Sequence, residues 1–447
     1  MNLKLIVKNL SENDKIVYKN AVEAFAIKGF ALVVSLFTMP VYMRYFSDNE
    51  ILGVWFTVLS VLAWILNFDL GIGNGLRNKL SMALAKNDIK AAKEYISSAY
   101  WMIGMIVLLL WLVGSILIPL CSWNSFFNIS IEVISPEDLS KVVQYAFLGI
   151  MLQFFLRLIS SIIYALQKSA INNMLALVTS VSQLAFALIA PCQTPVENLK
   201  MFSIAYIFCV NVPLFAATIW VFKKWLYRCV PSVRFFSIEK AKSVLSLGGI
   251  FFVCQILYMI IANTNEFFIT QYTGPQNVVI YQAYNKIFTL GSTLYMLALT
   301  PIWSAVSKAI AENNYNWLRK ISSNISKMSF LAMAVEFMLI PFLQILMNIW
   351  LGDGIITVDY RYAACFALYG SAMIYQSGVS TITNGTGRMR IQAICYGVGV
   401  VVKFIIIDIG VLITGSWVIV VLANAVVLVP YCVIQQISLN KFMKQKN

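Results

Sequence analysis

The sequence predicts an all-α polytopic membrane protein with twelve transmembrane helices in two six-helix lobes. Of its 447 residues, 60% are hydrophobic and only 12% are charged, about half the charged fraction of a soluble protein. The mean hydropathy is +0.79, and apolar runs of about 20 residues, the length that spans a bilayer, recur along the chain. The basic residues also gather in alternate loops, which is typical of membrane proteins.

The apolar runs give the approximate bounds of the spans. We expect the membrane-spanning cores at 21–43, 51–68, 97–120, 140–166, 171–191, 201–222, 246–270, 278–303, 326–348, 360–383, 391–414 and 417–439. Only residues 167–170 separate the fourth and fifth cores. We therefore expect these two cores to form a tight helical hairpin.

The distribution of Lys and Arg predicts the orientation. Most of the 33 basic residues lie in the two tails and in the even-numbered loops. The odd-numbered loops contain Arg44 and Lys200, with Lys141 and Arg361 at span edges, and they carry acids such as Glu132 instead. Because basic loops stay in the cytoplasm, we expect a multi-pass protein with both termini cytoplasmic.

The segment 68–94 (FDLGIGNGLRNKLSMALAKNDIKAAKE) connects the second and third spans. Its glycines predict a break after the second span, and the basic residues that follow predict an amphipathic interfacial helix at 76–95. The second half of the chain repeats part of it: Ser81, Ala83, Ala85 and Asn87 match Ser307, Ala309, Ala311 and Asn313. This repeat, at corresponding places, indicates that the two halves are built alike.

The longest loop divides the chain between the sixth and seventh spans. We expect an amino-terminal six-helix lobe at 1–222, a cytoplasmic linker at 223–245 and a carboxy-terminal six-helix lobe at 246–447. Because six is even, both lobes enter the membrane in the same direction. This predicts a pseudo-twofold axis along the membrane normal, with a binding site at the lobe interface.

Four cations fall inside predicted spans: Lys28, Arg157, Lys286 and Lys403. A charge at bilayer depth is costly, so each should face a cavity or a partner. Arg157 and Lys286 lie on polar stripes at helical spacing, the second with Gln282. We therefore expect the four cations to form a substrate-binding cavity, which would suit an anionic substrate that carries phosphate.

Two of these cations have a second interpretation. Lys28 lies close enough to the cytoplasmic end of its span to snorkel to the interface. Lys403 has few polar neighbours in sequence, so pairing with an intramembrane carboxylate is its alternative role.

Three acids are also embedded: Glu266, Glu336 and Asp408. Glu266 and Asp408 are our candidates for coupling transport to a gradient of H⁺ or Na⁺, and neutralising the cations is the alternative role. The tyrosines Tyr164, Tyr258 and Tyr281 lie on the same faces as the polar residues. They are candidates for contact with sugar rings, with packing as the alternative.

Several classes of chemistry are excluded or not expected. The chain has no histidine, so imidazole relays, HExxH zinc sites and Ser-His triads are excluded. No two of its eight cysteines form a CxxC motif, so we expect neither a metal site nor a disulfide framework. No loop is long enough to carry a catalytic domain, so the chain is not expected to be an enzyme. We expect no cofactor, no nucleic-acid partner and, from the polar first 20 residues, no signal peptide.

A family resemblance agrees with this layout. The first span ending in Pro40-Val41-Tyr42, the FDLGIGNG motif, the basic segment after it and the six-plus-six arrangement resemble the Wzx-type lipid-linked oligosaccharide flippases. These belong to the multidrug/oligosaccharidyl-lipid/polysaccharide exporter superfamily. Relatives place cations near the substrate diphosphate, and Lys28 and Lys286 occupy comparable positions here.

The resemblance implies a specific function. It implies alternating access in the bacterial inner membrane, surrounded by membrane lipids. The implied substrate is undecaprenyl-diphosphate carrying an O-antigen or similar repeat unit, which moves from the cytoplasmic to the periplasmic leaflet. A polysaccharide polymerase and a chain-length regulator are the implied protein partners. The alternative from the same superfamily is a drug/cation antiporter, which would have an acid-dominated cavity.

Overall fold

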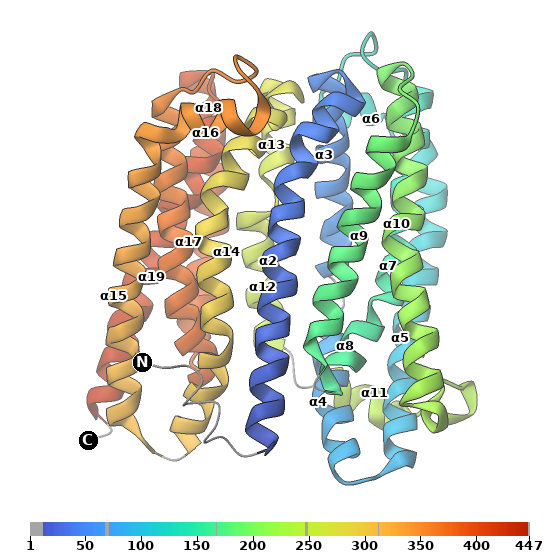
Figure 1. The fold of residues 1–447 in the computed structure, drawn as a ribbon, viewed down its shortest axis with the longest axis vertical. Coiled ribbons are helices and arrows are strands. Elements are labelled where there is room, and N and C mark those ends of the chain that lie inside the picture. Colours follow the sequence, from blue (N-terminus) through green and yellow to red (C-terminus); the bar gives the residue numbers. More distant parts are fainter. Residues whose placement is uncertain (1–11, 68–70, 167, 246–248, 312, 446–447) are drawn as a thin grey trace. The chain divides into compact units, whose positions relative to one another are not determined.

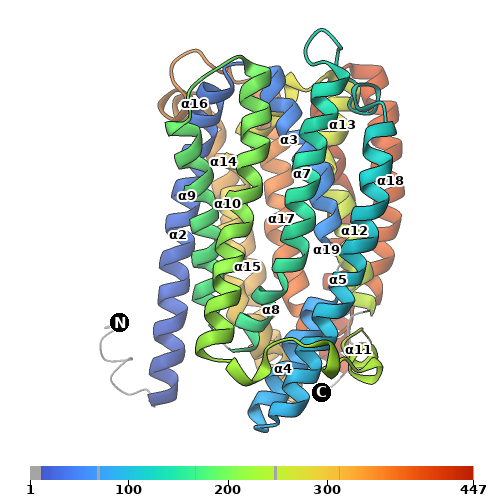
Figure 2. The same ribbon diagram turned by 90° about the vertical axis from the view of Figure 1, so that its right-hand side faces the viewer.

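The computed structural model describes residues 12–67, 71–166, 168–245, 249–311 and 313–445, and these residues form helices and turns with no strand among them (Figure 1, Figure 2). In chain order the elements are α2 (Glu12–Phe46), α3 (Asn49–Ala63), η1 (Trp64–Asn67), α4 (Ile72–Ala85), α5 (Ile89–Leu120), α6 (Trp123–Phe127), α7 (Pro136–Leu156), α8 (Leu158–Ala165), α9 (Ser169–Ile189), α10 (Pro195–Lys224), η2 (Tyr227–Cys229), η3 (Val233–Phe235), α11 (Ile238–Leu245), α12 (Gly249–Ala262), α13 (Asn265–Thr273), α14 (Gln276–Ala311), α15 (Tyr315–Leu339), η4 (Ile340–Phe342), α16 (Leu343–Leu351), α17 (Tyr360–Thr386), α18 (Arg390–Thr414) and α19 (Val418–Gln445).

The predicted spans all fall on helices. Within the described residues, 10 helical segments are long and apolar enough to cross a membrane. The two remaining predicted spans fall on α14 and α17, which have 36 and 27 residues and are therefore also long enough. The prediction of an all-α, multi-pass membrane protein is confirmed. The predicted hairpin is present too, because α8 ends at Ala165, α9 begins at Ser169, and Asn172 Nδ2 donates to the Ser160 carbonyl oxygen at 3.0 Å.

The chain folds as two compact units. Unit 1 comprises Met1–Ser47, Phe68–Cys121 and Glu137–Gly249, and unit 2 comprises Asp48–Asn67, Ser122–Pro136 and Ile250–Asn447. The units differ from the predicted lobes, since α3 and α6 join unit 2. The reason for α3 is close packing: a Cβ added at Gly53 would lie 1.9 Å from the Pro275 carbonyl oxygen. The division into two six-helix functional lobes stays a prediction.

Three predicted spans are broken rather than continuous. Arg157 separates α7 from α8, residues 263–264 separate α12 from α13, and η4 separates α15 from α16. At the first break the chain tightens, because the Ser160 N–H donates to the Arg157 carbonyl oxygen only three residues earlier, at 2.9 Å. The apolar composition that predicts these three spans does not indicate their breaks.

The predicted interfacial helix at 76–95 is also wrong, because α4 ends at Ala85 and α5 starts at Ile89. Asn87 has a left-handed φ of 55°, and the Asp88 side chain caps α5 by accepting from the Ala91 N–H at 2.9 Å. The repeat has the same turn, since Asn313 also has a φ of 55° and Asn314 caps α15. The sequence repeat is therefore also a structural repeat. Asp69, which lies in the segment before Gly71, is outside the described residues.

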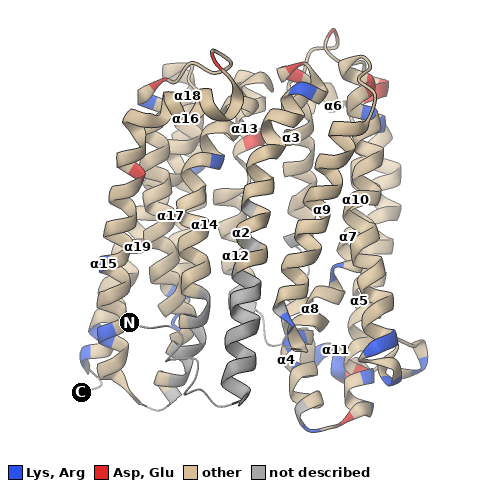
Figure 3. Cartoon of the chain, viewed as in Figure 1, with Lys and Arg blue, Asp and Glu red and all other residues tan. Residues whose placement is uncertain are grey.

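The predicted linker is folded onto unit 1. The Ser237 N–H donates to Ser98 Oγ of α5 at 3.0 Å, and the Ser232 N–H donates to Ser97 Oγ at 3.1 Å. Gly75 of α4 lets α11 approach, because an added Cβ would lie 2.0 Å from the Val244 carbonyl oxygen. Figure 3 shows basic residues gathered around α4 and α11, as the positive-inside pattern predicts for one end of the helices.

Candidate functional site

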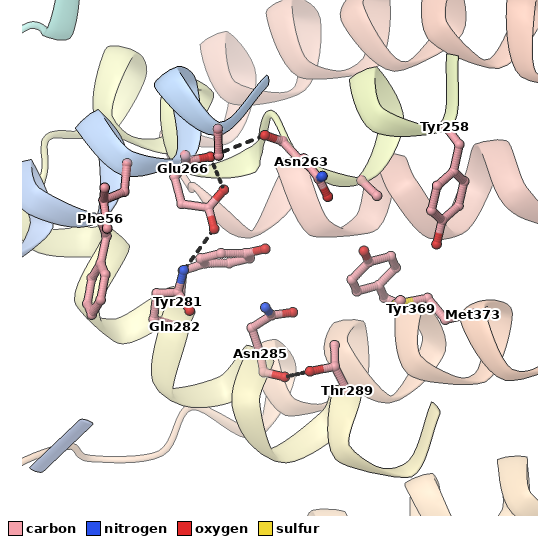
Figure 4. Close-up of a pocket in the computed structure, with 14 residues that line it drawn as sticks. Phe56, Tyr258, Asn263, Glu266, Tyr281, Gln282, Asn285, Thr289, Tyr369 and Met373 are labelled. Atoms are coloured by element: carbon pink, nitrogen blue, oxygen red, sulfur yellow. Dashed lines mark hydrogen bonds between the residues drawn. The ribbon is translucent and has the colours of Figure 1, made fainter. Parts of the chain in front are cut away.

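A pocket of about 570 Å³ lies in unit 2, beside the break between α12 and α13 (Figure 4). Its walls come from α3, the α12–α13 break, α14 and α17. The lining residues are Phe56, Leu59, Ser60, Ala63, Tyr258, Ala262, Asn263, Glu266, Tyr281, Gln282, Asn285, Thr289, Tyr369 and Met373.

Glu266 is the acid of this pocket, and two helices hold its carboxylate in place. Ser60 Oγ of α3 donates to Oε2 at 3.0 Å, and Gln282 Nε2 of α14 donates to Oε1 at 2.8 Å. Trp64 Nε1 donates to the Asn263 carbonyl oxygen at 2.6 Å, which ties the broken segment to η1. The pocket therefore has a fixed acceptor of hydrogen bonds.

The rest of the lining is aromatic and amide-rich. Figure 4 shows Tyr281 and Asn285 beside Glu266, with Tyr258 and Tyr369 further along the pocket. Asn285 Oδ1 is buried and has no hydrogen-bond partner among the described residues, so it is available to a ligand. No Lys or Arg is among the described residues that line the pocket. Aromatic faces with a few convergent polar groups suit a ligand that has both hydroxyls and apolar faces.

Lys403 lies outside this pocket, enclosed in the protein. Its side chain is 0% exposed. Its Nζ donates to the Ile261 carbonyl oxygen at 2.5 Å, Thr264 Oγ1 at 2.9 Å, Asn265 Oδ1 at 3.0 Å and the Ile260 carbonyl oxygen at 3.4 Å. The prediction that Lys403 lines a substrate cavity is therefore corrected. Its ammonium donates hydrogen bonds to oxygens at the break in the seventh span, where the regular helical hydrogen bonds are interrupted.

The polar network continues from the lysine toward the pocket. Asn265 Oδ1 also accepts from Asn424 Nδ2 at 2.9 Å, and Asn265 Nδ2 donates to the Tyr281 hydroxyl at 3.0 Å. Tyr281 lines the pocket. The cation, the break and the pocket wall are thus joined by direct hydrogen bonds.

The other predicted cations are in different surroundings. Arg157 is exposed at the junction of α7 and α8 in unit 1. Lys286 is half-buried on α14, between Gln282 and Thr289, which both line the pocket. The side chain of Lys28 lies outside the described residues. A cavity shared by these three cations stays a prediction.

The two predicted coupling acids are also in different environments. Glu266 lines the pocket, whereas Asp408 is exposed on α18 and accepts a hydrogen bond from the Tyr272 hydroxyl. Ion coupling at either residue stays a prediction. Within the part of the chain that the structure describes, no group of three or more acidic or cysteine side chains could hold a metal ion.

Sequence reasoning found part of the pocket and missed part of it. Tyr258 and Tyr281, expected on polar faces, do line it, whereas Tyr164 lies in unit 1 with the Arg77 guanidinium 4.9 Å from its ring centroid. Ser60 and Asn285 were missed. The run of polar residues at 263–265 inside an apolar segment was the available signal for the break.

A bundle of membrane-spanning helices with a polar pocket among them is typical of membrane transport proteins. Its fold is similar to that of a multidrug resistance MATE family transporter of the MOP superfamily in an inward-facing conformation, with a TM-score of 0.74 and 14% identity over 95% of this chain and 99% of that chain. It is also similar to the lipid II flippase MurJ in an inward closed conformation, with a TM-score of 0.71 and 14% identity over 94% of this chain and 87% of that chain.

The sequence itself identifies the family. Residues 17–306 match the polysaccharide biosynthesis protein family, and the chain belongs to that family. A Yersinia pseudotuberculosis protein named for O-antigen export is 22% identical over 340 residues, which cover 75% of this chain and 76% of that protein. The resemblance to Wzx-type flippases is confirmed, and these relatives are transporters and flippases rather than enzymes.

Proposed function

We propose that this protein is a flippase for undecaprenyl-diphosphate-linked O-antigen or similar repeat units. It moves them from the cytoplasmic to the periplasmic leaflet of a bacterial inner membrane by alternating access, with both termini in the cytoplasm. The family, the relative named for O-antigen export and the fold shared with a lipid II flippase support this proposal. The observation that carries it is the pocket of tyrosines, amides and one fixed carboxylate in unit 2.

The pocket would receive the glycan. Sugar hydroxyls donate to Glu266 and to the unpartnered Asn285 Oδ1, which are the acceptors that the pocket offers. The rings of Tyr258 and Tyr281 cover the apolar faces of the sugar. The diphosphate is met by cations outside the pocket, for which Arg157, Lys286 and Lys28 are the candidates, and the lipid tail stays in the bilayer.

A complementation experiment tests this assignment. Glu266→Ala and Asn285→Ala are expected to lower surface polysaccharide several-fold in a strain that depends on this protein, and lipid-linked repeat units should accumulate in the inner leaflet. Asp353→Asn, in an exposed loop, is the matched control and should export normally. Normal surface polysaccharide in both pocket variants, at normal protein levels, would remove the pocket from the mechanism.

A separate pair of variants tests the cations. Arg157→Ala and Lys286→Ala, singly and together, are expected to reduce export, because both are proposed to bind the diphosphate. Flipping supplies lipid-linked repeat units on the outer leaflet. A polysaccharide polymerase and a chain-length regulator are therefore the proteins we propose to act next to this one.

One observation favours a second candidate, a drug/cation antiporter. The pocket contains the carboxylate of Glu266 and no basic side chain among its described lining residues, and such a lining also suits an organic cation. Efflux of cationic dyes distinguishes the two functions. The antiporter is supported if dye efflux depends on Glu266 while surface polysaccharide does not.

A further inference from the structure

Glu336 is a carboxylic acid buried inside unit 2, apart from the pocket. It lies on α15, in the segment Tyr315–Leu351 that is apolar enough to cross a membrane, and it is 2% exposed. A Cβ added at Gly291 of α14 would lie 2.4 Å from Oε1, and one added at Gly370 of α17 would lie 3.1 Å from Oε2. The carboxyl group therefore fills a notch that exists because both helices have glycine there.

The notch offers the Oε2 atom of this carboxyl group no compensation for a negative charge. Oε2 is buried without a hydrogen-bond partner among the described residues, and no ion pair joins Glu336 to a described Lys or Arg. An ionised carboxylate in such a site would lose hydration at Oε2 without gaining a hydrogen bond or an ion pair there. The packed arrangement therefore requires the neutral acid, which carries its proton.

The ionisable groups on the packed helices do not change this conclusion. Those nearest to the two glycines in sequence are Lys286 and Tyr295 on α14 and Cys365, Tyr369 and Tyr375 on α17. Cys365 precedes Gly370 by more than one turn, and the Tyr295 hydroxyl is hydrogen-bonded to α15 itself, about two to three turns before Glu336 (about 3.6 residues per turn). The Tyr375 ring packs on α15, and Tyr369 lines the pocket. Lys286 precedes Gly291 by more than one turn, and α19 meets α15 about four turns before Glu336.

We propose that Glu336 is a proton-binding site, occupied when α15 packs on α14 and α17 and emptied when that packing opens. Proton binding and helix packing are then linked, so each favours the other. Alkaline conditions should favour the open arrangement. The ligand is the proton, and the site differs from the candidates Glu266 and Asp408.

Infrared spectroscopy tests the bound proton directly. The full-length protein in lipid nanodiscs, above neutral pH where exposed carboxyls are ionised, should show the carbonyl stretch of a neutral carboxyl group. Glu336→Gln should lose that band. Glu132→Gln, an exposed acid of unit 2, should keep it, and Glu266→Gln should keep the Glu336 contribution.

Hydrogen exchange tests the link to packing. In the wild type, backbone amides in peptides from 315–351 should exchange faster at alkaline pH than the pH dependence of the intrinsic amide exchange rate explains. This excess exchange should disappear in Glu336→Gln. Peptides from unit 1 serve as the internal reference. If the glutamine variant does not fold, Glu336→Met, which fills the notch without a proton, replaces it in both experiments.

Two results would overturn the proposal. One is a wild-type protein with no neutral carboxyl band above neutral pH, which needs no variant at all. The other is the same band or the same exchange profile with and without the Glu336 carboxyl group. Neither measurement involves the glycan substrate, so failure here leaves the proposed flippase function untouched.

Discussion

Replacing Lys403 by methionine tests whether its ammonium stabilises the fold or binds substrate. The variant keeps the side-chain volume but removes the ammonium that donates to four oxygens. The Ile261 carbonyl oxygen loses a charge-assisted bond worth about 1.5–3 kcal/mol, while Thr264 and Asn265 lose less because each keeps another bond. Removal of the buried charge returns part of its desolvation cost. We expect a net loss of about 2 to 4 kcal/mol in the free energy of unfolding.

Denaturant unfolding of the purified protein in detergent, followed by tryptophan fluorescence, measures this loss. The control is Lys141→Met. Lys141 is exposed and pairs with Glu137 at 2.7 Å on the same helix, so the control should unfold like the wild type. If Lys403→Met keeps the wild-type free energy of unfolding within about 0.5 kcal/mol but loses polysaccharide export, the ammonium contacts substrate and the scaffold argument is refuted.

Three further outcomes follow from the structure. Gly53→Ala should lower the free energy of unfolding by about 3 kcal/mol or prevent folding, because the added Cβ would lie 1.9 Å from the Pro275 carbonyl oxygen. Gly29→Ala should not destabilise the protein, because nothing lies within 4 Å of its added Cβ. Thermal unfolding of both variants checks this. Burial raises the pKa of the Cys229 thiol, so its modification by maleimide, which needs the thiolate, should require a higher pH than modification of free cysteine in solution; equal pH profiles would contradict this. In intact cells, a membrane-impermeant maleimide should label exposed Cys192, which the predicted orientation places on the periplasmic side, whereas labelling of Cys192 only after the cells are opened would reverse that orientation.

The spans could be predicted because they depend on local composition. The apolar runs of α5, α10 and α18 are long enough to cross a bilayer whatever their neighbours are. The break between α12 and α13 has a local signal in the polar residues at 263–265, but the partner that stabilises it could not be predicted in this way. Lys403 donates to the oxygens of the break and lies 138 to 143 residues away in the sequence, so no window of local sequence contains both partners.

The residues of the candidate site also divide into those that local sequence predicts and those that it does not. Gln282 could be predicted because it lies at helical spacing from Lys286 on α14, and Tyr258 and Tyr281 because they lie on the same faces as polar residues. The two hydroxyls of apolar α3, Thr57 and Ser60, are too few to give a sustained periodic signal. The bond from Ser60 to Glu266 nevertheless fixes the acid of the pocket. Lys403 is predicted to face a cavity or a partner because a buried charge is costly, and its partners are main-chain and side-chain oxygens at the break between α12 and α13.

The break in the seventh span therefore determines the chemistry on both of its sides. Away from the pocket, oxygens of Ile261 and Thr264 accept hydrogen bonds from the Lys403 ammonium. Toward the pocket, Asn263 and Glu266 present groups that hydrogen-bond. Lys403 is enclosed in the scaffold, so under the proposed function the pocket of unit 2 would receive the uncharged part of the glycan, and the phosphates would be met by Arg157, Lys286 and Lys28. The double variant of Arg157 and Lys286 is therefore the decisive test of that proposal.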